Sequence, residues 1–202
     1  MKLYYLPASC SLASHIVLRE LGLDFDLERY DPAAGTTDKG TSYNTINAKA
    51  RVPALALDSG DLLTEGSAIV QYLVATHQHT DLSLPDDLMA RARIHEGLSF
   101  VASDFHKTFG PLFTTDTDDA AQERAKRTIV KHLDYLESVF ADGRDYFVDN
   151  KLSVADIYLF VVLRWTDATG TPLAGWKHLN AFRDRINQRP AVQASLAAEG
   201  LN

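Results

Sequence analysis

"KLYYLPASCSLASHIVLRELG", residues 2–22, joins a strand-like run to a helical one and contains the only cysteine in the chain. The run "KLYYL" predicts a strand, and "SLASHIVLRELG" predicts a helix that ends at Gly22. Apolar residues alternate in "DFDLERYD", residues 24–31, which predicts a second strand. A strand–helix–strand beginning favours a parallel pair of strands.

The next fifty residues predict a hairpin and another helix. After a polar loop at 32–41, "VPALALDSGDLLTEG", residues 52–66, has two short apolar runs on either side of the turn "DSGD". The segment 66–77 predicts a helix whose apolar face is formed by Ala68, Ile69, Tyr72 and Leu73. The order β-α-β-loop-β-β-α predicts a small mixed sheet covered by helices, an α/β domain.

Beyond residue 80 the pattern is helical. Two segments carry apolar residues at helical spacing: Leu98, Ala102, Phe105, Phe109 and Leu112 in the first, and Ile129, Leu133, Leu136 and Phe140 in the second. "SVADIYLFVVLRW", residues 153–165, starts with Ser153 and Asp156 in capping-box spacing and predicts a central, buried helix. Two closing helices are expected, separated at Pro190. We predict a first domain at 1–80, a linker at 81–86 and an all-α domain at 87–202.

Composition excludes several classes of protein. Twenty-seven acidic and twenty basic residues give a formal charge of −7, which argues against a nucleic-acid partner. A single cysteine excludes an internal disulfide framework. The longest apolar stretch, "IYLFVVL", is too short to cross a bilayer, and the N-terminal run is broken by Pro7 and Ser9, unlike a signal peptide. We expect a cytoplasmic protein with no membrane partner.

Cys10 is the first candidate for chemistry. If Ser9 caps the helix, Cys10 lies in its first turn, an environment that lowers the pKa of a thiol. The alternative is that Cys10 is a small buried apolar residue. Ala13 stands where a dithiol redox motif would have its second cysteine. A reactive Cys10 would therefore need an external thiol, and glutathione is the abundant one in the cytosol.

His106 is the best-placed histidine. Glu96, Ser99, Ser103 and His106 form a polar stripe beside the apolar stripe of the first long helical segment. This stripe is either the wall of a cleft or simply the solvent face. An imidazole there would suit proton transfer near neutral pH. His77 and His79 have no further ligands at useful spacing, so we expect no metal site.

Two short motifs predict a site for a peptide-like ligand. A cis bond before Pro53 would turn the backbone N–H and C=O of Val52 outward, where an extended peptide can pair with them. "TEGSAI" begins a helix, with Thr64 as the expected cap. There the N–H groups of Gly66 and Ser67 suit a carboxylate, and Glu65 suits an ammonium group. Together these features match the γ-glutamyl end of glutathione.

The motifs "MKLYYLPASCSLASHIVLRE", "VPALALDSGDLLTEGSAIVQYL", "FHKTFGPLF" and "SVADIYLFVVLRW" resemble bacterial glutathione S-transferases of the beta class, nearly end to end. The resemblance implies a thioredoxin-like N-terminal domain, an all-α C-terminal domain, a homodimer and glutathione as co-substrate. It implies three catalytic residues: Cys10, which can form a mixed disulfide with glutathione, with Tyr5 and His106 near the thiol. It implies that glutathione is also bound by Val52, Pro53, Glu65, Gly66, Ser67, Ser99, Ser103, Asp104 and Lys107, partly from the second subunit.

Three departures from the family pattern affect glutathione binding. Gly35 stands where the family often has a lysine for the glycyl carboxylate, and Lys39 is the nearest substitute. Ala48 and Ala50 replace a turn proline and glycine, and Ser99 replaces an asparagine. Loss of one charged contact costs about 1–3 kcal/mol, which is roughly tenfold to over a hundredfold in affinity.

The leading hypothesis is a glutathione transferase that conjugates glutathione to small hydrophobic electrophiles near His106, Phe109 and Phe113. Cys10 adds glutathione-dependent thiol–disulfide or peroxide reduction. Two alternatives remain open at this point. One is a non-catalytic, ligandin-like or stress-response binding protein on the same fold. The other is a specialised glutathione-dependent dehalogenase or ether-cleaving enzyme.

Overall fold

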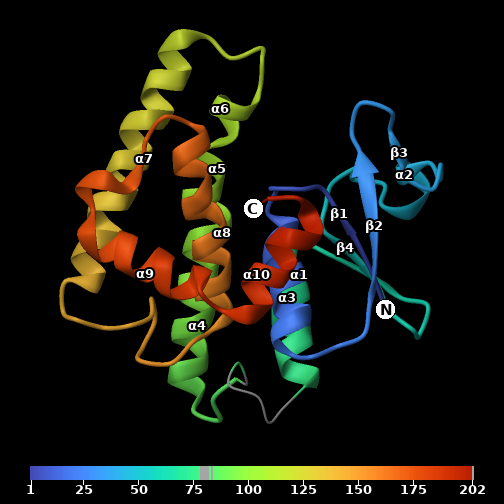
Figure 1. Ribbon diagram of the computed structural model, residues 1–202, viewed down its shortest axis with the longest axis horizontal. Helices are drawn as coiled ribbons and strands as arrows, with labels where there is room; N and C mark the ends of the chain where they lie inside the picture. Colours follow the sequence, from blue (N-terminus) through green and yellow to red (C-terminus); the bar gives the residue numbers. More distant parts are fainter. Residues whose placement is uncertain (78–81, 83, 202) are drawn as a thin grey trace. The chain divides into compact units, whose positions relative to one another are not determined.

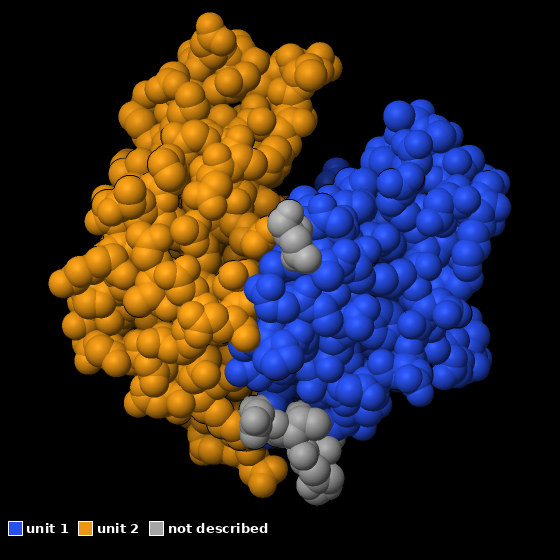
Figure 2. Space-filling view, in the orientation of Figure 1, with its two compact units in different colours: residues 1–84, 189–202 blue, residues 85–188 orange. Residues whose placement is uncertain are grey.

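The computed structural model describes residues 1–77, 82 and 84–201. The chain forms two compact units, one of residues 1–84 and 189–202 and the other of residues 85–188 (Figure 2). Residues 189–201 therefore pack with the first unit, whereas the sequence pattern assigned them to the all-α domain. Residues 81 and 83 of the predicted linker, and His79, lie outside the described residues.

Unit 1 is a mixed five-stranded sheet with helices (Figure 1). The strands run in the order β3-β2-β1-β4-β5, with β1 parallel to β2 and the other neighbours antiparallel. The elements are β1 (Lys2–Tyr5), α1 (Ser11–Glu20), β2 (Asp26–Asp31), β3 (Thr36–Thr37), α2 (Tyr43–Ile46), β4 (Ala54–Ala56), β5 (Leu62–Thr64), α3 (Gly66–Thr76) and α10 (Pro190–Glu199). The predicted parallel pair and hairpin are confirmed.

Two details of unit 1 differ from the sequence prediction. The expected loop at 32–41 contains β3, a two-residue strand that pairs with Tyr30 and Asp31 of β2. The buried face of α3 is formed by Ile69, Val70, Leu73 and Val74, while Tyr72 is exposed. The prediction for Tyr72 is wrong because α3 buries two adjacent pairs of residues one turn apart, and Tyr72 lies outside that stripe.

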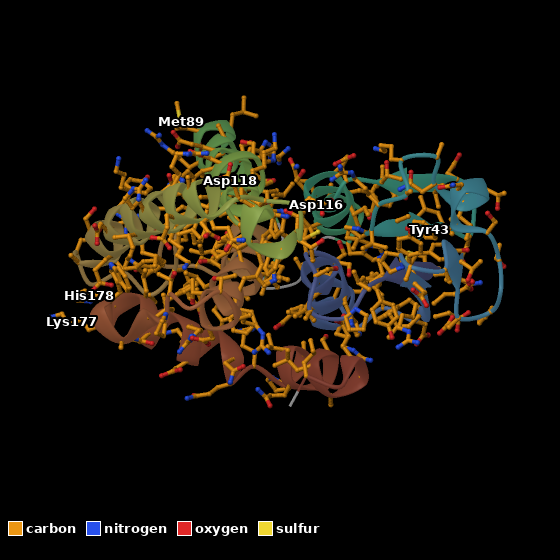
Figure 3. All side chains as sticks on the ribbon, turned by 90° about the horizontal axis from the view of Figure 1, so that it is seen from above. Tyr43, Met89, Asp116, Asp118, Lys177 and His178 are labelled. Atoms are coloured by element: carbon orange, nitrogen blue, oxygen red, sulfur yellow. The ribbon has the colours of Figure 1, made fainter. Side chains whose placement is uncertain are left out.

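Tyr43, labelled in Figure 3, connects β2 to the turn that precedes β4. Its buried ring stacks on Tyr30, with 4.0 Å between the ring centroids. The Tyr43 hydroxyl donates to the carbonyl of Arg51 at 3.0 Å, and the amide of Asn47 donates to the same carbonyl at 2.7 Å. The turn at 47–51, which precedes β4, is therefore held from two sides.

Unit 2 is helical throughout its regular structure. Its elements are α4 (Leu88–Phe100), the π-helix η1 (Val101–Phe105), α5 (His106–Thr108), α6 (Gly110–Phe113), α7 (Asp119–Phe140), α8 (Val154–Ala168), the 3₁₀-helix η2 (Leu173–Gly175) and α9 (Lys177–Asn187). Helix α8 is buried along most of its length and has the predicted capping box. The predicted core residues of α7, Ile129, Leu133, Leu136 and Phe140, are all buried. In the described part of the chain, no helix is long and apolar enough to cross a bilayer.

Candidate functional site

The sheet register of unit 1 brings the predicted N-terminal site residues to one edge. Ala54, at the start of β4, pairs with Tyr4 of β1 and with Thr64 at the end of β5. Tyr5 follows Tyr4, Pro53 precedes Ala54, and Glu65 follows Thr64. Residues that are sixty positions apart in the sequence are therefore neighbours at the same end of three adjacent strands.

Cys10 lies at this edge, at the junction with α1. The helix begins at Ser11, one residue later than predicted, so Cys10 occupies the N-cap position and makes no side-chain cap hydrogen bond. The capping side chain is still that of Ser9, whose hydroxyl accepts from the Ser11 N–H at 3.2 Å. The N–H groups of Leu12 and Ala13 donate to the carbonyls of Ser9 and Cys10, both at 3.2 Å. The first N–H groups of α1 therefore already have acceptors within the protein.

The Cys10 thiol is half-buried and faces the strand edge. It donates to the carbonyl of Val52 at 3.6 Å. The Val52–Pro53 peptide bond is cis, as the sequence suggested. Within the described residues, no protein acceptor takes the N–H of Val52. The only cysteine therefore lies beside a backbone segment with a donor left for a ligand.

Glu65 begins α3 differently from the prediction. It is the N-cap residue in place of Thr64, and its φ of 70° is in the left-handed region. Its carboxylate forms an ion pair with the ammonium group of Lys49, a residue that sequence reasoning missed. The Asn47 side chain accepts from the Lys49 N–H at 3.1 Å and so helps to present Lys49. Gly66 and Ser67 form the first turn of α3, and α3 has no side-chain cap.

Two other residues of unit 1 bear on the site. Burial raises the pKa of the Tyr5 phenol, and the negative charge of Glu199 raises it further, so Tyr5 is a neutral hydrogen-bond donor or acceptor near pH 7. Lys39, the substitute suggested for the missing loop lysine, lies 3.6 Å from the buried carboxylate of Glu28. Lys39 is therefore already part of an ion pair.

The C-terminal candidates lie in unit 2. His106 Nδ1 is 3.0 Å from the hydroxyl of Tyr158, and its ring meets Trp165 edge to face at 4.7 Å. Phe113 also contacts the Trp165 ring edge to face and is 54% exposed. Sequence reasoning missed Tyr158 and Trp165, because the apolar character of α8 concealed which of its residues face His106.

The predicted polar stripe in unit 2 is exposed, apart from the half-buried His106. Its members Ser99 and Ser103 lie on α4 and η1, and two further expected glutathione-binding residues, Asp104 and Lys107, are exposed on η1 and α5. The Ser103 hydroxyl donates to the carbonyl of Ser99, and the Asp104 carboxylate is 3.6 Å from His132. The prediction that these residues and Cys10 line one site stays a prediction. Among the described residues, no group of three metal-binding side chains is present.

Comparisons with known proteins identify the family. The N-terminal and C-terminal domain models of glutathione S-transferases match residues 8–76 and 93–190. The chain is 42% identical to glutathione S-transferase GstA of Escherichia coli O157:H7, with full coverage of both chains. A sphingomonad glutathione S-transferase in complex with glutathione has a TM-score of 0.96 at 44% identity, again with full coverage. A beta-class enzyme of Sphingomonas chungbukensis also has a TM-score of 0.96, at 42% identity over both full chains. The chain therefore belongs to the glutathione S-transferase family, as a bacterial-type member of the beta class.

Proposed function

We propose that this glutathione transferase binds its co-substrate glutathione along the Val52 edge and uses Cys10 for covalent exchange with the glutathione sulfur. The observation that carries the proposal is the 3.6 Å contact between the Cys10 thiol and the Val52 carbonyl. A peptide paired with Val52 would have its own cysteine sulfur close to Cys10. The resemblance of the chain to a relative solved with glutathione supports the same ligand.

The γ-glutamyl end of glutathione would bind at the start of α3. The N–H groups of Gly66 and Ser67 suit its carboxylate, because the first N–H groups of a helix lack helical partners. Its ammonium group would replace the ammonium of Lys49 on Glu65. Both side chains of that ion pair are at least half exposed, so the exchange costs little.

The exchange reaction follows from thiol chemistry. The Cys10 thiolate attacks one sulfur of oxidised glutathione, a new S–S bond forms, and one glutathione thiolate leaves. A second glutathione thiolate then attacks the sulfur of bound glutathione in the mixed disulfide, releases oxidised glutathione and regenerates the Cys10 thiolate. A glutathionylated substrate in place of oxidised glutathione would be reduced by the same two steps.

Conjugation to an electrophile would use the aromatic residues of unit 2. Phe113 and Trp165 offer apolar surface for a small hydrophobic electrophile, and His106 can move a proton near neutral pH. Residues Ser99, Ser103, Asp104 and Lys107 would complete the glutathione site of a homodimer, in which the second subunit supplies part of the set. The cytoplasm, where glutathione is abundant, is the compartment that we propose.

The proposal is tested by intact mass after incubation with oxidised glutathione. Wild-type protein should gain one glutathione, and a Cys10→Ala variant should gain none. Conjugation of glutathione to a chlorinated nitrobenzene, followed by absorbance, separates the two activities. If the wild type forms no adduct but conjugates, covalent exchange is refuted and transfer stands. If it does neither and still binds hydrophobic dyes, the chain acts as a carrier.

A further inference from the structure

A chain of hydrogen bonds with a buried centre connects the last helix to the loop that carries Cys10. The Glu199 carboxylate on α10 receives the N–H of Ala8 at 3.2 Å and contacts His15 Nδ1 at 2.9 Å. His15 Nε2 in turn accepts from Arg19 Nε at 2.9 Å. The side chains of His15 and Glu199 are fully buried. Helices α10 and α1 lie side by side in unit 1 (Figure 1).

The Arg19 guanidinium fixes the tautomer of His15. A guanidinium has only donors, so His15 Nε2 must be the acceptor and the ring proton must be on Nδ1. His15 Nδ1–H therefore donates to Glu199. One Glu199 carboxylate thus accepts from two separate donors, the His15 ring and the Ala8 backbone.

Ala8 occupies a position where the backbone needs support. Its φ of 61° is in the left-handed region, which is unfavourable for a residue with a Cβ. It lies two residues before Cys10, in the loop between β1 and α1. The Ser9 N–H closes the same loop by donating to the carbonyl of Leu6 at 3.2 Å. The buried Glu199 carboxylate, which accepts from the Ala8 N–H, therefore holds the loop in the conformation that presents Cys10.

We infer that Glu199 is a positioning residue for Cys10, acting through the Ala8 N–H, with its own orientation set by His15 and Arg19. The inference rests on the proposed function, because it assumes that Cys10 reacts with the glutathione sulfur. Glu199 itself touches neither the thiol nor the substrate. The negative charge of Glu199 also acts on Tyr5, at the end of β1.

A glutamine cannot replace Glu199 while Arg19 is present. Its amide has one acceptor oxygen, and its NH₂ group would face either Ala8 N–H or His15 Nδ1–H, donor against donor. Removal of Arg19 releases the tautomer of His15. The ring proton can then move to Nε2, and Nδ1 can accept from the glutamine NH₂ while the glutamine oxygen accepts from Ala8. An Arg19→Met change should therefore rescue Glu199→Gln.

The test is a double-mutant cycle with two readouts: hydrogen exchange of the peptide covering residues 6–12, and the rate of mixed-disulfide formation with oxidised glutathione. We expect Glu199→Gln to speed exchange in that peptide and to slow disulfide formation about tenfold. In the Arg19→Met background, the same change should alter both readouts by less than twofold. Glu20→Gln is the matched control, because Glu20 pairs with Arg189, the N-cap residue of α10, at 2.6 and 2.8 Å and makes no contact with the loop in the described structure.

Three outcomes would overturn the inference: wild-type exchange and rate in Glu199→Gln, equal losses in Glu20→Gln, or no rescue by Arg19→Met. The exchange readout does not involve glutathione. If wild-type Cys10 forms no disulfide while the cycle holds for exchange, the proposed function fails and the role of Glu199 in ordering the loop stands. If Cys10 forms the disulfide but the cycle fails for hydrogen exchange, the proposed function stands and the role of Glu199 in ordering the loop is refuted.

Discussion

Asp156 should be the most sensitive polar residue of unit 2. Its carboxylate is fully buried and accepts three hydrogen bonds: from the N–H of Phe147 at 2.6 Å, from the N–H of Ser153 at 2.8 Å and from the Ser153 hydroxyl at 2.7 Å. These bonds join the segment before α8 to its first turn. An Asp156→Asn change preserves the volume but replaces one acceptor oxygen by a donor.

At least one buried donor then lacks an acceptor and faces an NH₂ group. The cost of such an orphaned donor is about 1–3 kcal/mol, and the remaining bonds are weaker without the carboxylate charge. We expect Asp156→Asn to lower the free energy of unfolding by about 3 kcal/mol at pH 7, measured by urea titration. The control is Ser153→Ala, which leaves the Asp156 carboxylate in place and removes only the hydroxyl of the capping box; it should cost about 1 kcal/mol.

The pH dependence tests the electrostatics separately. Burial raises the pKa of Asp156 to about 6, against an ordinary value of 3.8, although its three donors oppose the shift. Because the pKa of Asp156 is higher in the folded state than in the unfolded state, the protonated carboxyl contributes to the stability of the fold. That contribution is fully present below pH 4 and is lost as the pH rises through 6. The gap between wild type and Asp156→Asn should therefore be about 1 kcal/mol wider at pH 5 than at pH 7. The reasoning would be refuted if the difference in free energy of unfolding between wild type and Asp156→Asn became smaller at pH 5. It would also be refuted if that difference were below 1 kcal/mol at pH 7.

Three further changes give clear expectations. Gly97→Ala places a Cβ 3.0 Å from the nearest side-chain atom and should cost about 1–3 kcal/mol in urea unfolding; unaltered stability would contradict this packing. Leu136→Ala, at a fully buried position, should cost about 2–5 kcal/mol, whereas Tyr135→Ala, at a 51% exposed position on the same helix, should cost far less. Tyr158→Phe removes the hydroxyl that contacts His106. The kcat for conjugation should fall by about fivefold, with the KM for glutathione unchanged. An unchanged kcat would show that the contact with Tyr158 is not needed for the role of His106.

Much of unit 1 is predictable because local signals agree there. The alternation in β2, the turn between β4 and β5, and the helical spacing in α1 each depend on neighbours within a dozen residues. The strand β3 escaped prediction because two threonines carry no periodicity. It exists because Thr36 and Thr37 pair with β2. Tyr72 was misplaced because helical spacing gives the width of an apolar stripe but does not fix which residue lies at its margin.

The candidate site divides in the same way. Cys10, Val52 and Glu65 are marked by local features, namely a helix start, a proline and a cap. Lys49 was missed because its partner Glu65 is sixteen residues away and any surface lysine could have formed the pair. Glu199 and His15 are 184 residues apart, and each would be unremarkable alone.

The placement of α10 explains why sequence pattern could not assign it. Its helical spacing resembles that of the helices before it, so local reasoning groups it with unit 2. A buried carboxylate is stable only where donors meet it, and the donors for Glu199 are in the first fifteen residues of the chain. The hydrogen bonds that Glu199 accepts, in addition to the burial of apolar side chains, therefore favour the packing of α10 on α1. It follows that the loop bearing Cys10 depends on both ends of the sequence, and that a change near residue 199 can alter the chemistry of residue 10.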